Sequence, residues 1–198
     1  MFTIYLIVVG LIIFAVGAGA LGVWLRANRS KENAERSSRV MHLLFFVFMI
    51  APPLIAIFYP GLTRLDVLVG LQPLPLKTVF LVLGIILAVP GLYFLAITNK
   101  LLRSLGSGAN AFRLTKQIVA DDIYKRTRNP MSLGFYLAAL ALGFISGSTF
   151  ATIAVVLGLI PAHIFFLKYF EELELELRFG KSYLEYKKSV PFLIPGRA

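Results

Sequence analysis

The chain has 198 residues, of which 58% are hydrophobic and only 15% are charged, and its net charge is +10. Soluble domains carry about 25% charged residues, so this composition excludes an ordinary soluble domain and predicts a membrane protein. The absence of cysteine excludes disulfides, thiolate metal sites and cysteine nucleophiles.

Apolar residues gather into five blocks that have the length expected of membrane-spanning helices. A span needs roughly 20 helical residues to cross about 30 Å of hydrocarbon. The predicted spans are 1–25, 40–59, 76–98, 131–146 and 149–170. We therefore predict an all-α integral membrane protein with about five transmembrane helices, the fourth of them short.

The connections between the first three spans are polar or rich in turn residues. Residues 26–39 are predicted to form a polar linker, and residues 60–75 a turn region on the opposite side. Pro52 in the second span and Pro90 in the third are expected to kink their helices, because proline removes a backbone hydrogen bond. Such kinks can open a cavity between helices.

The last two spans are predicted to form a tight antiparallel hairpin, because only a Gly147 turn separates them. The final helix is expected to continue beyond the membrane to Phe179, where Gly180 suits the left-handed position that ends many helices. The tail, 181–198, is predicted to be extended rather than helical because of its two prolines.

The basic residues are distributed very unevenly. If the spans alternate direction, 18 of the 20 Lys and Arg lie on one side, and only Arg64 and Lys77 on the other. Cytoplasmic loops carry such an excess, which predicts an outside N-terminus and a cytoplasmic C-terminus. Orientation and contact with anionic lipid explain the charge, and no nucleic-acid-binding motif accompanies it.

Several motifs follow one another in the second half of the chain. They are Leu105-Gly106, Tyr124, Arg128-Asn129-Pro130, Glu171-Glu172, Phe179-Gly180, Tyr183, Tyr186 and Val190-Pro191. Together they resemble the isoprenylcysteine carboxyl methyltransferase and phospholipid methyltransferase family of integral membrane enzymes. The resemblance divides the chain into three N-terminal transmembrane helices, 1–98, and a catalytic half, 99–198.

The resemblance implies a methyltransferase that uses S-adenosylmethionine, held in a small cytoplasmic pocket that the C-terminal tail caps. The implied catalytic residues are Arg128 and Glu172. The implied cofactor contacts are Gly106, Gln117, Val119, Tyr124, Asn129, Pro130, Glu171, Tyr183, Tyr186 and Phe192. Carboxylates suit the ammonium or ribose hydroxyls of this cofactor, and aromatic rings suit its adenine.

The charged residues of this half also have simpler interpretations. Arg128 can bind the carboxylate of the cofactor or of an acidic acceptor bidentately, or it can simply anchor the helix at the membrane surface. We expect function for the Glu171-Glu172 pair. Glu174 and Glu176 are interpreted as ordinary charged positions of a helix end, with Glu174 four residues before a basic residue.

The predicted acceptor is a lipidic or small apolar molecule that enters from the bilayer between kinked helices. A carboxylate acceptor is favoured and would be oriented by Arg128, whereas an amine acceptor would need Glu171 or Glu172 as a base. Ser132 stands where the family usually has tyrosine, and Phe192 where arginine is frequent. These two departures leave the acceptor open.

Two other functions fit the sequence in part. One is a sterol-reductase-like enzyme that uses NADPH, and the other is a non-catalytic membrane scaffold or lipid-binding protein. His163 lies inside the last span, where an ionisable residue is formally a functional candidate. We interpret it as a neutral histidine that is hydrogen-bonded to a neighbouring helix.

Overall fold

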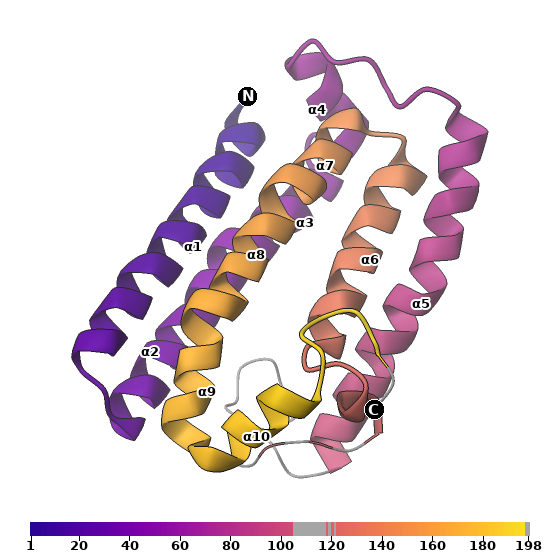
Figure 1. Ribbon diagram of the computed structural model, residues 1–198. Coiled ribbons are helices and arrows are strands. Elements are labelled where there is room, and N and C mark those ends of the chain that lie inside the picture. Colours follow the sequence, from indigo (N-terminus) through magenta and orange to yellow (C-terminus); the bar gives the residue numbers. More distant parts are fainter. Residues whose placement is uncertain (105–117, 119, 121, 197–198) are drawn as a thin grey trace.

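The computed structural model describes residues 1–104, 118, 120 and 122–196, and within this part of the chain every regular element is a helix (Figure 1). The α-helices are α1 (Phe2–Ala27), α2 (Lys31–Leu44), α3 (Ala51–Phe58), α4 (Leu62–Leu68), α5 (Lys77–Ser104), α6 (Pro130–Ser146), α7 (Thr149–Ile153), α8 (Ile160–Phe166), α9 (Glu172–Phe179) and α10 (Lys181–Ser189). The π-helical turns are η1 (Phe45–Ile50), η3 (Ala154–Leu159) and η4 (Leu167–Glu171), and η2 (Asp122–Lys125) is a 3-10 turn.

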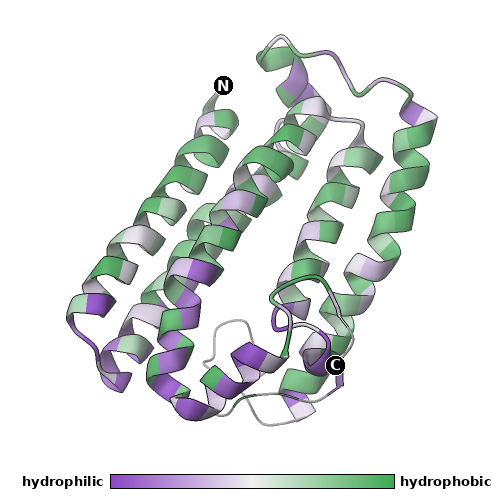
Figure 2. Cartoon of the chain, in the orientation of Figure 1, coloured by the Kyte–Doolittle hydropathy of each residue, from purple (hydrophilic) through white to green (hydrophobic). Residues whose placement is uncertain are grey.

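Four of the predicted spans correspond to long apolar helical segments, and α6 is the short fourth span. The long segments are Phe2–Ala27, Lys31–Phe58, Lys77–Ser104 and Thr149–Phe179. Hydrophobic residues line the middle of the helices, and hydrophilic residues gather at the end of the bundle that holds α9 and α10 (Figure 2). The predicted all-α membrane architecture is therefore confirmed.

The helices form two groups that lie side by side. In one group α1 packs against the α2–η1–α3 segment and against α8, and in the other α5 packs along α6 (Figure 1). Glycines allow the close contact in the second group: a Cβ built on Gly91 would lie 2.8 Å from the Ala138 nitrogen, and one on Gly134 would lie 2.9 Å from the Gly91 oxygen. Small residues commonly permit such approach between membrane helices.

Asp66 of α4 connects this helix to the beginning of α7 at the end of the bundle away from α10. Its carboxylate is fully buried and accepts hydrogen bonds from the Phe150 nitrogen at 2.6 Å, the Thr149 nitrogen at 3.2 Å and the Ser148 hydroxyl at 3.1 Å. These backbone N–H groups belong to the unsatisfied first turn of a helix. Asp66 thereby caps the last membrane helix from a separate segment, and Gly147 makes the predicted tight turn with φ of 71°.

The prolines of the second and last spans follow π-helical turns. The turn Phe45–Ile50 ends two residues before Pro52, and Ala154–Leu159 ends two residues before Pro161. A π-helical turn is wider than an α-helical turn and is a recognised way for a helix to accommodate a local interruption. Both spans therefore continue as helices through their prolines.

Two predictions about polar segments were wrong. Helix α2 begins at Lys31 within the predicted linker, because the Ser30 hydroxyl accepts a hydrogen bond from the Asn33 nitrogen at 3.0 Å and caps it. The tail forms helix α10 up to Ser189 and becomes extended only from Val190. Gly180 has the expected positive φ of 59°, but its ψ of −131° places it outside the left-handed helical region.

Candidate functional site

The segment before α6 is bound to the C-terminal segment 190–196 by main-chain groups. The Arg128 nitrogen donates to the Pro191 oxygen at 2.9 Å, and the Gly196 nitrogen donates to the Arg126 oxygen at 3.0 Å. The Thr127 hydroxyl, fully buried, adds a 2.8 Å bond to the Leu193 oxygen. The C-terminal segment is thus held across the beginning of α6.

Asn129 and Pro130 contribute to this junction in different ways. The Asn129 side-chain amide donates to the Phe192 oxygen at 2.8 Å. Pro130 stands at the start of α6, where a missing N–H costs nothing and the fixed φ favours a helix. Asn129 and Pro130 thus connect Arg128 both to the C-terminal segment and to the beginning of α6.

The two charged residues predicted to be catalytic, Arg128 and Glu172, meet near the C-terminal segment. Arg128 Nη1 lies 3.1 Å from Glu172 Oε1, and both side chains are largely buried, with 9% and 12% exposure. Lys187 Nζ bridges the other Glu172 oxygen at 2.7 Å and Glu176 Oε1 at 2.8 Å. Two carboxylates and two cations from three elements therefore form one ion-pair network, which we call the charge cluster (Arg128, Glu172, Glu176 and Lys187).

Hydrogen bonding in the charge cluster is incomplete. Arg128 Nε and Nη1 and Glu172 Oε1 are buried, and none of them makes a hydrogen bond within the described part of the chain. The 3.1 Å contact between Nη1 and Oε1 is thus an ion pair without hydrogen-bond geometry. Buried polar atoms form hydrogen bonds in the great majority of cases. Buried donors and an acceptor that lie side by side without hydrogen bonds therefore indicate a binding site for a polar ligand.

Three tyrosines surround the charge cluster. The Tyr186 hydroxyl donates to the Tyr124 carbonyl oxygen at 2.8 Å, and the rings of Tyr183 and Tyr186 lie with centroids 6.3 Å apart. Burial, then the charges of Glu171 and Glu172, raise the pKa of the Tyr183 hydroxyl. Burial also raises the pKa of Tyr124 and Tyr186, so all three remain protonated at neutral pH and can donate hydrogen bonds.

Phe192 lies between two cations. Lys168 Nζ is 4.1 Å from the centroid of its ring, and Arg128 Cζ is 5.7 Å from it. Both distances fall within the range of cation–π attraction. Phe192 thus contacts Arg128 of the cluster, and the described contacts of Lys168 are with this ring rather than with the neighbouring glutamates.

The four glutamates at the end of the last membrane helix have different environments. Glu174 pairs with Arg178 at 2.6 Å with both side chains buried, and Glu176 pairs with Lys187. The predicted Glu174–Arg178 pair is confirmed, although it is buried and not solvated. Glu171 is partly buried and makes no ion pair in the described ranges.

The structure brings most of the predicted site residues to one end of the bundle, around α10. They are Tyr124, Arg128, Asn129, Pro130, Glu171, Glu172, Tyr183, Tyr186 and Phe192. Gly106, Gln117 and Val119 lie outside the described residues. Sequence reasoning missed two cluster members: Glu176, which was interpreted as an ordinary charged position, and Lys187. A helical prediction for the tail would have placed Lys187 one turn after Tyr183.

Comparison with known protein families gives one match. The family described as phospholipid methyltransferase matches residues 79–182, just over half of the chain. The matched range contains Arg128, Asn129, Pro130 and the glutamates, and it ends before Tyr183. Searches of curated proteins and of solved structures found no match.

Proposed function

The chain belongs to the phospholipid methyltransferase family of integral membrane methyltransferases, and on this premise we propose that it transfers a methyl group from S-adenosylmethionine to an apolar acceptor in the membrane. The family membership and the apolar helices support a membrane methyltransferase. The donor and the acceptor are our proposal, and the contacts of the charge cluster carry it.

The unmet hydrogen-bonding atoms of the cluster fit the amino-acid head of this donor. The head carries a carboxylate and an ammonium group, which require donors and an acceptor side by side. Arg128 Nε and Nη1 are such donors and Glu172 Oε1 is such an acceptor, all buried and without hydrogen bonds in the described chain. We propose that Arg128 holds the carboxylate and Glu172 the ammonium, while Lys187 keeps Glu172 in place.

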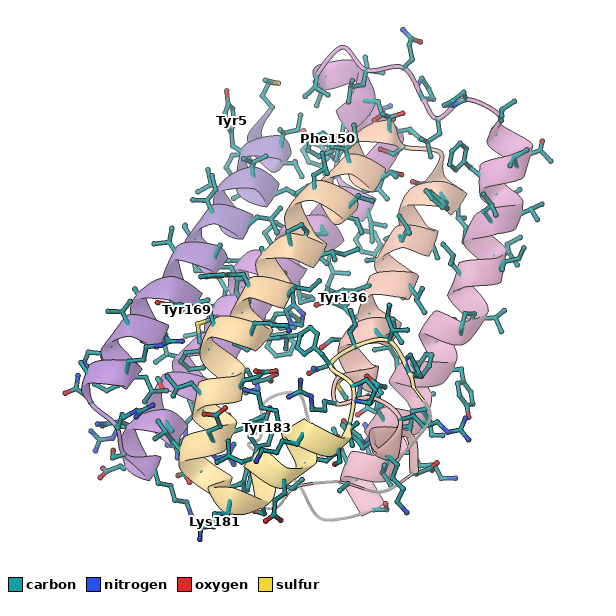
Figure 3. All side chains as sticks on the ribbon, viewed as in Figure 1. Tyr5, Tyr136, Phe150, Tyr169, Lys181 and Tyr183 are labelled. Atoms are coloured by element: carbon teal, nitrogen blue, oxygen red, sulfur yellow. The ribbon has the colours of Figure 1, made fainter. Side chains whose placement is uncertain are left out.

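The aromatic residues around the cluster supply the other contacts that the donor needs. Tyr183 is 4% exposed and lies above the α9–α10 turn (Figure 3). Tyr124, Tyr186 and Phe192 border the same region. We propose that these rings cover the adenine, and that the hydrogen bonds of segment 190–196 hold the cover closed. The bound donor supplies an electrophilic methyl group, and the protein's main task is alignment, which can contribute several kcal/mol.

The sequence allows either a carboxylate acceptor or an amine acceptor, which must lose a proton. The contacts of the glutamates favour the acceptor that loses a proton. A carboxylate acceptor would have to compete with Glu172 for Arg128, whose charge Glu172 already compensates. Glu171 makes no ion pair in the described residues and stands among tyrosines, so it is the available proton acceptor. We therefore propose an acceptor that loses a proton on methylation, with a carboxylate as the second candidate.

The site is proposed to face the cytoplasm. The argument is the excess of Lys and Arg on the side of α10, in keeping with the charge bias of cytoplasmic loops. Because the natural chain lacks cysteine, single cysteines at Lys188 and at exposed Thr63 can report the orientation. In spheroplasts or sealed vesicles of known sidedness, a membrane-impermeant maleimide should label only the Thr63 variant from the outside. Labelling of Lys188→Cys from the outside would reverse the orientation.

Calorimetric titration of S-adenosylhomocysteine into the detergent-purified protein tests the proposed donor. We expect saturable binding, weakened about 10- to 100-fold in Arg128→Gln and in Glu172→Gln, because each removes charged hydrogen bonds worth about 1.5–3 kcal/mol. Glu185→Gln, at an exposed position of α10, is the matched control and should bind normally. A folded protein that gives no heat with the compound would contradict the proposal.

A further inference from the structure

A buried polar pair connects the two helix groups in the apolar part of the bundle. The Tyr136 hydroxyl of α6 and His163 Nδ1 of α8 lie 2.8 Å apart, and the two residues are only 4% and 6% exposed. This contact confirms that His163 bonds to a neighbouring helix. Polar groups at this depth are costly, and an intramembrane ionisable residue is a functional candidate by default.

Four phenylalanine rings lie around the His163 ring. The centroids of Phe14, Phe45, Phe135 and Phe166 lie between 5.1 and 6.2 Å from the centroid of the His163 ring. No other polar side chain of the described residues is hydrogen-bonded to the pair. The second ring nitrogen of His163, Nε2, has no hydrogen-bond partner in that part of the chain.

The pair stands between two regions of different polarity. On one side, Tyr183 of the site lies beyond Tyr136 toward α10 (Figure 3). On the other side, Phe135 contacts both rings of the pair and also lines an apolar cavity of about 280 Å³. The pair thus marks the border between the charged site and an apolar space.

The cavity lies between the two helix groups and is bounded by lipid-facing residues. Its walls include Pro53 and Leu54 of α3 and Leu142 of α6, and Leu54 and Leu142 are 50% and 40% exposed. Engineered apolar cavities of roughly 150 Å³ hold benzene, so the present volume holds one short apolar chain or a compact apolar group. Two full acyl chains of a phospholipid would have to remain in the bilayer.

We propose that Tyr136 and His163 bind the polar head of the methyl acceptor, and that the apolar cavity holds its single apolar chain. The proposal rests on the proposed function and names the substrate class: a compound with one apolar chain and a neutral hydrogen-bonding head. Whichever ring nitrogen carries the proton, the pair offers one further N–H or O–H donor. A carboxylate head is disfavoured by burial among aromatic rings.

The two histidines of the chain allow a direct test by nitrogen NMR. In protein labelled with ¹⁵N-histidine in nanodiscs, 1-decanol should shift the Nε2 resonance of His163 in a saturable way. Decane has the same chain without a head and should produce no such shift, and decanoate should produce a much smaller one. His42, which bonds to the Ser38 carbonyl oxygen on α2, is the internal control and should not respond.

Two variants and one parallel titration separate the possible outcomes. Tyr136→Phe should weaken the response to 1-decanol at least tenfold, and Tyr93→Phe, at an exposed position of α5, should leave it unchanged. Both variants should bind S-adenosylhomocysteine like the natural chain. An unresponsive His163, or equal responses to 1-decanol and decanoate, would overturn this inference. If the natural chain shows the 1-decanol response but does not bind S-adenosylhomocysteine, the proposed function is overturned instead.

Discussion

Arg128 Nη1 and Glu172 Oε1 lie 3.1 Å apart, yet these facing atoms make no hydrogen bond in the described part of the chain. Arg128 precedes α6, and Glu172 begins α9, so the pair forms only when the hairpin of the last two spans is complete. Charge neutrality is satisfied while hydrogen bonding is not. This combination is what we expect of a site prepared for a ligand that carries both charges.

The first prediction concerns stabilisation by ligand. A ligand that binds only the folded state at 100 times its dissociation constant adds about 2.7 kcal/mol of stability. S-adenosylhomocysteine should therefore raise the Tm of the natural chain. It should raise the Tm of the double variant Arg128→Gln/Glu172→Gln by much less, since this variant keeps the site neutral. Equal shifts in the two proteins, measured by scanning fluorimetry in one detergent, would contradict the assignment.

The second prediction concerns Lys187 and pH. Burial alone would lower the pKa of Lys187, but its hydrogen bonds to Glu172 and Glu176 outweigh burial and raise the pKa above its ordinary 10.5. A group with a raised pKa stabilises the fold fully below its unfolded pKa, and this contribution is lost as pH rises through the folded value. The Tm difference between the natural chain and Lys187→Gln should therefore be constant from pH 7 to 9 and shrink above about pH 10.5.

Lys188→Gln provides the control for this experiment. Lys188 is adjacent in sequence and exposed, and the described contacts give it no ion pair. Its replacement should change the Tm little at any pH in the same range. A difference for Lys187→Gln that grows between pH 7 and 9 would show that the ion pairs with Glu172 and Glu176 do not act as described.

The third prediction concerns the cap that Asp66 forms on the last membrane helix. Asp66→Ala should lower the free energy of unfolding by about 2–3 kcal/mol, because helix caps and charged hydrogen bonds are each worth about 1–3 kcal/mol. Thr63→Ala, at an exposed position of the same helix, is the control. The cap is at the opposite end of the bundle from α10 (Figure 1), so folded Asp66→Ala should bind S-adenosylhomocysteine normally. An unchanged unfolding free energy would contradict the structural role.

The fourth prediction concerns the contact between α5 and α6. Gly91→Val should destabilise the protein by at least 2 kcal/mol, because its Cβ would lie 2.8 Å from the backbone nitrogen of Ala138 and neither helix can yield without a backbone shift. Val89→Leu, 68% exposed on the same helix, should be nearly neutral. Chemical or thermal unfolding in detergent distinguishes them. Similar stability of the two variants would mean that α5 and α6 are less closely packed.

Hydrophobic length was sufficient to predict the membrane helices, because a bilayer imposes the same requirement on every span. It did not predict the beginning of α2, since residues 31–39 expose charged residues and bury only small ones, among them Ala34 and Ser38. Ion pairs four residues apart, such as Arg36–Glu32 at 2.6 Å, support that helix, and their spacing was visible in the sequence. The polarity of the segment obscured this pattern.

The candidate site was predicted residue by residue through family resemblance, but its connections were not. Lys187 was missed because two prolines near the end of the tail favoured an extended chain, whereas the helix ends before either of them, at Ser189. Asp66 was missed because a single acidic residue in a turn region carries no local pattern. Its partners are more than 80 residues away, and only the fold brings them together.

The most direct test of the account compares the affinities of S-adenosylhomocysteine and 5′-methylthioadenosine, which lacks the amino-acid head. If Arg128 and Glu172 hold that head, the natural chain should bind the first compound at least tenfold more tightly. Arg128→Gln and Glu172→Gln should lose this preference while retaining their affinity for 5′-methylthioadenosine. Equal affinities in the natural chain, or a preference that survives in both variants, would contradict the assignment of the charge cluster.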